Sequence, residues 1–228
     1  MMTSDQERGR GEVADPLADT VAATHDLLAS RLAEAEESRP TASEPRRPLR
    51  ATDPFLASTS RHVGAATAVL APAARRHLPD GRQRGHALAR QGRRLEGALF
   101  ATKAKLYGST YAVRRPWPAI WEEVEDAFER FWQLERQLVD DLTAATTPES
   151  RDAVAQRLYR LEQRVPTRPH PYLPHLGLTG HIARGVAQRV DRFWDTAEGR
   201  MVPEPVRPRR SREGPFVQYL LADPHVES

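Results

Sequence analysis

Cysteine is absent from this chain of 228 residues. Without a thiol, the protein has no disulfide, no thiolate nucleophile, no iron–sulfur cluster and no zinc site with cysteine ligands. A metal ion would therefore have to be bound by histidine and carboxylate side chains. The sequence also lacks a glycine-rich phosphate loop, a dinucleotide-binding glycine fingerprint, an HExxH pair and a GxSxG turn. These absences favour a protein without ordinary catalytic activity, although they do not exclude an enzyme.

Long apolar runs are missing as well. No segment approaches the roughly 18 consecutive apolar residues that a membrane span needs. The first residues do not follow the basic-then-apolar plan of a secretory signal. We therefore predict a soluble, cytoplasmic protein that has no membrane span.

Lysine is scarce, so arginine supplies nearly all of the positive charge. The formal net charge of +3 is too small to indicate a nucleic-acid partner. The charge is nevertheless uneven, because residues 75–94 hold seven arginines against Asp80 alone. Since this stretch straddles a predicted turn and has no interleaved aromatic residues, an arginine-mediated nucleic-acid binder is the weakest of the functions that we consider.

Apolar residues recur at helical spacing through most of the chain. The expected helices, in chain order, are 15–37, 54–77, 82–108, 119–142 and 148–165, with helix resuming around 182–193. Asp53-Pro54 and Thr147-Pro148 each read as a capping residue followed by a first-turn proline. Residues 38–54 contain four prolines and no apolar periodicity, which is typical of a linker. The N-terminal helix is expected to be loosely attached or, in a metal-free interaction module, to be itself the partner helix that the bundle receives.

These patterns predict an all-α protein, an up-down bundle of four to five helices with flexible terminal extensions. We divide the chain into an N-terminal helix plus disordered linker (1–53), a helical bundle domain (54–199) and a Pro/Arg-rich tail (200–228).

Two ionisable residues interrupt apolar helix faces, where burial would be costly without a partner. Glu135 lies on the face that also carries Phe131 and Leu138, and His62 is flanked at helical spacing by Ala66 and other apolar residues. Glu96 and Glu162 lie only at the edges of their apolar stripes. The histidines expected at the surface are His25, His77, His181 and His225.

His170 and His175 frame a proline-rich crossing segment between residues 166 and 174. If that segment folds back over the bundle, one or both could join His62 and Glu135 on one metal ion. Imidazole and carboxylate ligands suit iron, zinc or manganese, so the residue types do not select the metal. In the competing interpretation, Glu135 is a structural partner of a buried arginine and the protein is a metal-free interaction module.

Two stretches carry a family resemblance. ATDPFLASTSRHVGAATAVLAPAARRHLPDG, followed by a long helix and then by FERFWQLERQLVDDL, resembles the haemerythrin-like (cation-binding HHE) arrangement of actinobacterial proteins. The resemblance covers roughly residues 53–198 and implies an up-down four-helix bundle with a di-iron centre. His62 then matches the first-helix histidine, and Glu135 the glutamate of an HxxxE pair.

The chain also departs from that family pattern. Phe131 stands where the histidine partner of Glu135 belongs, and His86 is followed at the pair spacing by Arg90. Two ligands of a di-iron centre are thus missing. The expectation is therefore a degenerate site that uses His62 and Glu135 with help from His170 and His175, holding iron or another divalent metal if any ion binds. A protein partner for the bundle is the expectation of the metal-free alternative.

Overall fold

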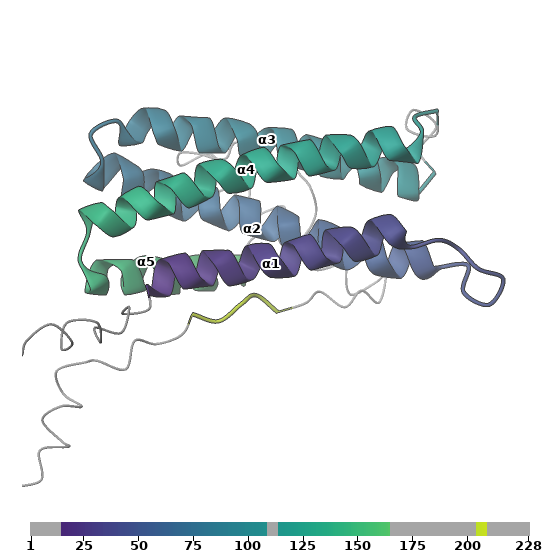
Figure 1. The fold of residues 1–228 in the computed structure, drawn as a ribbon, viewed down its shortest axis with the longest axis horizontal. Helices are drawn as coiled ribbons and strands as arrows, with labels where there is room; N and C mark the ends of the chain where they lie inside the picture. Colours follow the sequence, from purple (N-terminus) through teal and green to yellow (C-terminus); the bar gives the residue numbers. More distant parts are fainter. Residues whose placement is uncertain (1–14, 109–113, 165–203, 209–228) are drawn as a thin grey trace, which may run out of the picture.

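The computed structural model describes residues 15–108, 114–164 and 204–208 (Figure 1). These residues form five helices and no strand. The helices are α1 (Pro16–Glu37), α2 (Arg47–His77), α3 (Gly81–Leu106), α4 (Trp117–Ala145) and α5 (Pro148–Glu162). Successive helices run in opposite directions along one long axis (Figure 1). The predicted all-α, up-down bundle is therefore confirmed. None of the five helices combines the length and the hydropathy that a membrane crossing requires.

Helix α2 lies at the centre of this arrangement. The first four helices pack in a ring: each contacts the next one along the chain, and α4 contacts α1. The shorter α5 packs on α1 and α2 and touches α4 more lightly. Because α2 contacts all four other helices, all of its residues from Phe55 to Ala71 are buried, including polar ones. A charged side chain within this buried stretch therefore needs a partner inside the protein.

The linker is shorter than the sequence suggested, because α2 begins at Arg47 rather than at Pro54. Pro54 lies inside the helix, and so does the boundary that we placed after residue 53. A proline in a helix interior removes one backbone hydrogen bond. Phe55 and Leu56 are 0% and 2% exposed. Burying each of these side chains stabilises the fold by about 1.5–3 kcal/mol, which is enough to offset the roughly 3 kcal/mol that the proline costs. Tertiary packing thus overrides the local signal of the proline.

The expectation that the N-terminal helix is loosely attached is also wrong. Helix α1 buries a row of apolar residues in the same core as the other helices. Its first turn is capped by Asp15, whose carboxylate accepts hydrogen bonds of 3.0 Å from the backbone N–H groups of Leu17 and Ala18. Such a cap satisfies N–H groups that have no partner within the helix.

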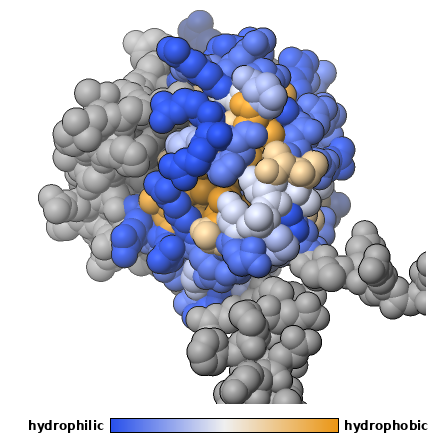
Figure 2. Space-filling model, turned by 90° about the vertical axis from the view of Figure 1, so that its left-hand side faces the viewer, coloured by the Kyte–Doolittle hydropathy of each residue, from blue (hydrophilic) through white to orange (hydrophobic). Residues whose placement is uncertain are grey.

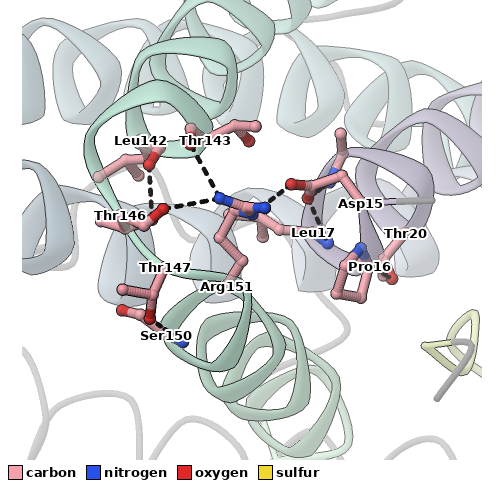
Figure 3. Close-up of polar contacts among 11 residues, drawn as sticks. Asp15, Pro16, Leu17, Thr20, Leu142, Thr143, Thr146, Thr147, Ser150 and Arg151 are labelled. Carbon is pink, nitrogen blue, oxygen red and sulfur yellow. Dashed lines mark hydrogen bonds and ion pairs between the residues drawn. The ribbon is translucent and has the colours of Figure 1, made fainter. Parts of the chain in front are cut away.

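Arg151 fastens the start of α1 to the corner between α4 and α5 (Figure 3). Its guanidinium pairs with the Asp15 carboxylate. Its Nη1 donates to the backbone carbonyls of Thr143 and Thr146, at 3.0 and 2.7 Å. The predicted cap of α5 is present, since Thr147 accepts from the backbone N–H of Ser150. These contacts of Arg151 form a clasp that fixes the position of α1 against α4 and α5.

Candidate metal centre

Three side chains from three helices meet in the interior of the bundle. His25 comes from α1, His62 from α2 and Glu135 from α4. The Oε2 atom of Glu135 lies 2.7 Å from Nε2 of His25 and 3.0 Å from Nε2 of His62. One carboxylate oxygen is therefore shared by two imidazoles. The three residues are 1%, 2% and 0% exposed, so bulk water does not solvate this contact.

The helix patterns explain why these side chains meet. His25 follows Val21 by one turn and precedes Leu28 by three residues, so it lies on the buried face of α1. Glu135 lies in the same way between Phe131 and Leu138 on α4. Because α1 and α4 both pack on α2, their inward faces point toward His62.

A second carboxylate completes the partners of His62. Nδ1 of His62 lies 2.7 Å from Oε1 of Glu162, which comes from the last turn of α5 and is also buried. With a carboxylate at each ring nitrogen, His62 has an acceptor for both N–H groups of an imidazolium. A carboxylate behind a histidine in this way also fixes the ring orientation and the tautomer that a metal ligand needs.

The electrostatics of the metal-free cluster follow from these contacts. Burial alone would lower the pKa of His62, but the charges and hydrogen bonds of Glu135 and Glu162 raise it to about 10. Burial alone would raise the pKa of Glu135, but His62 and His25 lower it to about 2. Without a metal, the cluster is therefore an imidazolium held between carboxylates.

Aromatic rings and aliphatic groups form the walls around the cluster. The His25 ring packs edge-on against Trp132 with a centroid distance of 4.6 Å, and the His62 ring packs similarly against Phe131 at 6.5 Å. The two imidazole rings are nearly perpendicular, with centroids 5.4 Å apart. Electrostatic interactions are stronger in such a setting than in water, because apolar walls screen them little.

The donor set fits one divalent metal ion. One nitrogen from each imidazole and one carboxylate oxygen of Glu135 all lie within 4.8 Å of one another. Ligand atoms of a tetrahedral ion with bonds of about 2.0–2.2 Å lie roughly 3.3 Å apart. The present distances of 2.7 and 3.0 Å would therefore open by only a few tenths of an ångström. Two buried atoms of the cluster, Nδ1 of His25 and Oε1 of Glu135, have no hydrogen-bond partner, and the free oxygen could become a second bond to the ion.

Among the residues that the structure describes, no arginine forms an ion pair with Glu135, whose partners are the imidazoles of His25 and His62. A buried arginine is present on α2, where Arg61 is 7% exposed. Burial lowers the pKa of Arg61, and the charge of Glu162 opposes this effect. The competing interpretation placed a buried arginine against Glu135, and the described residues contain no such ion pair; the charge of Arg61 interacts with Glu162 instead.

The outcome for the other predicted residues is mixed. His62 and Glu135, the two positions singled out in the sequence, are in direct contact. His170 and His175 lie outside the described residues. His25, which we expected at the surface, is buried and faces Glu135, so that expectation is wrong. Glu96 is buried on α3, but it is not one of the three residues whose ligand atoms converge.

Comparisons of the chain with family models, curated proteins and solved structures found no match.

Proposed function

We propose that this protein is a metal-binding helical bundle in which His25, His62 and Glu135 hold one divalent transition-metal ion. The observation that carries the proposal is the convergence of two imidazole nitrogens on one carboxylate oxygen in the core. Three protein ligands leave at least one coordination position of a tetrahedral ion for a small exogenous molecule. The set lies within one bundle and is too small for two ions.

Glu162 supports this site from outside the ligand set. By accepting the Nδ1–H of His62, it leaves Nε2 of the same ring directed toward Glu135. Metal-bound histidines commonly donate their second N–H to a carboxylate in this way, and losing that partner typically lowers metal affinity 10- to 100-fold. The charges of Arg61 and Glu162 also attract each other, which partly balances the negative charge of that carboxylate.

Imidazole and carboxylate ligands are compatible with iron, zinc and manganese. The resemblance to haemerythrin-like proteins favours iron. With iron, the roles that follow are oxygen or nitric-oxide sensing, iron handling or protection against oxidants. All three use a buried ion with an open position, which is the arrangement proposed here.

A metal-free structural role is the second candidate, because the same contacts form a buried ion-pair network without any metal. His62 has a carboxylate at each ring nitrogen, and buried networks of this kind can fix the packing of a bundle. In that case the bundle would act as an interaction module, and the cluster would hold its helices in register.

Metal titration of chelator-treated protein separates the two candidates. Isothermal titration with Fe²⁺ under anaerobic conditions, and with Zn²⁺ and Mn²⁺, should give one site per chain for at least one ion. The site should be lost in Glu135→Gln and in His25→Gln. It should remain in Glu129→Gln and His86→Gln, which change exposed residues on α4 and α3. No stoichiometric binding by the folded wild type would leave the structural role as the better account.

A further inference from the structure

The end of α2 and the exposed surface of α3 are rich in arginine. We call the exposed arginines of these two segments that form no ion pair within the part of the chain that the structure describes the basic face: Arg75, Arg76, Arg82, Arg90, Arg93 and Arg94. On α3, positions 82, 90 and 93 lie within about 80° of one another around the helix, and residues 82–94 span about 18 Å along it. Figure 2 faces the end of the bundle where α2 ends and α3 begins, and hydrophilic residues cover much of the described surface there.

The arginines of the basic face have no ion-pair partner among the described residues, whereas several arginines elsewhere do. Arg84, which also lies on α3, pairs with Asp80 and Asp141. The other paired arginines of the described chain are Arg50, Arg115, Arg130 and Arg151. Since Asp80 is the only carboxylate between residues 75 and 94, the basic face presents six cations that form no ion pair with the described part of the chain.

The separate carboxylates of a second copy are a poorer partner than an external polyanion, whose charges follow one another at short regular spacing. Three of the exposed carboxylates of α4 are also paired within the chain already: Asp126 with Arg130, Glu123 with Arg115 and Asp141 with Arg84. An anionic membrane is also a poorer fit. Binding at a lipid interface uses several apolar side chains beside the charges, and Phe100 is the one large exposed apolar residue that the described part of α3 carries.

We propose that the basic face binds the phosphate backbone of double-stranded DNA without sequence preference. Phosphates follow one another at 3.4 Å along each strand of the duplex, so 18 Å of helix covers about five of them. Arginine suits this contact because its planar guanidinium donates two parallel hydrogen bonds to a phosphate. The small net charge of the chain argued against a nucleic-acid partner, because it sums the unpaired arginines with the paired charges of the other helices.

The salt dependence of binding gives the proposal a number. If each of the six arginines neutralises one phosphate, the logarithm of the association constant falls with the logarithm of the salt concentration with a slope of about −5. Between 50 and 200 mM salt, the affinity should then fall about 10³-fold. Removing three of the contacts should make the slope shallower by about 2.7.

Fluorescence anisotropy with a labelled 20-base-pair duplex tests the proposal on the full chain. The test variant is Arg82→Gln/Arg90→Gln/Arg93→Gln. The control, Arg136→Gln/Arg157→Gln/Arg164→Gln, removes the same charge from exposed positions on other elements. We expect weaker binding and a shallower slope in the test variant, and wild-type behaviour in the control.

Three results would overturn the proposal. They are no binding by the wild type at 50 mM salt, an equal loss in the control variant, and binding to vesicles containing 30% phosphatidylserine but not to the duplex. A second variant, Arg75→Gln/Arg76→Gln, repeats the test on α2 and should also bind the duplex more weakly. The conclusion then holds even if the first variant does not fold. These arginines are exposed, whereas His25, His62 and Glu135 are buried. The DNA-binding test therefore does not depend on metal binding.

Discussion

Replacing Glu135 tests the buried cluster in the absence of any metal. In Glu135→Leu, the imidazolium of His62 keeps Glu162 but loses the carboxylate at its other nitrogen, and His25 loses the carboxylate that lies 2.7 Å from its Nε2. Removing one member of a buried ion pair typically costs 3–5 kcal/mol, because the remaining charge stays buried. For a protein of this size, that corresponds to a fall in melting temperature of roughly 6–20 °C.

A double-mutant cycle isolates the contact itself. His62→Leu alone leaves Glu135 with one imidazole, whereas the double variant His62→Leu/Glu135→Leu removes both charges. We expect the double variant to be more stable than the sum of the two losses predicts, by about 2–3 kcal/mol. Urea unfolding with excess chelator at pH 7 measures all four proteins.

Glu129→Leu provides the matched control, because Glu129 lies on the exposed side of α4. Its cost should stay within about 0.5 kcal/mol. Strictly additive losses in the cycle, or a cost of Glu135→Leu as small as that of Glu129→Leu, would refute the reasoning. Either outcome would mean that the two residues are not in direct contact in a dry core.

Three further predictions concern the fold around the site. Arg151→Gln should lower the free energy of unfolding in urea by about 1–3 kcal/mol, because it breaks the clasp on α1 (Figure 3); a loss below about 0.5 kcal/mol would contradict this. Burial and the nearby carboxylate on α4 raise the pKa of Glu36 to about 7, so its contribution to stability is present below pH 4.5 and is lost as the pH rises through 7. At pH 8, Glu36→Gln should therefore gain about 1 kcal/mol after solvent screening, and an equal gain in Glu37→Gln would argue against the effect. Gly81→Ala should cost about 1–3 kcal/mol, because its new Cβ would lie 1.8 Å from a backbone oxygen of α2. Gly97→Ala has open space and should gain about 0.5–1 kcal/mol, so similar melting temperatures for these two variants would count against the packing.

The sequence predicted the helices well where apolar periodicity and local signals agree. Helix α4 has the clearest apolar stripe, and α5 has the Thr147-Pro148 start that the structure shows. The start of α2 was misplaced because Pro54 is a strong local signal for a helix start. Its neighbour Phe55 is fully buried, and that packing is a long-range effect that no local pattern contains.

The candidate site was predictable in part for a similar reason. His62 and Glu135 interrupt strong apolar stripes, and each therefore stands out within its own helix. His25 also follows an apolar stripe, but the expectation of a loosely attached N-terminal helix concealed its burial. Glu162 lies at the edge of its stripe, and only the position of α5 against α2 brings it to His62. The pairing of arginines with distant carboxylates is likewise a tertiary property.

The central claim is that His25, His62 and Glu135 share one metal ion, and anomalous X-ray scattering tests it most directly. Crystals of the protein loaded with Fe²⁺ or Zn²⁺ should be measured on both sides of the absorption edge of the metal. The account predicts one anomalous peak inside the bundle, about 2.0–2.2 Å from Nε2 of each histidine and from a carboxylate oxygen of Glu135. A metal-loaded crystal without a peak there, in which Glu135 still accepts directly from both imidazoles, would contradict it.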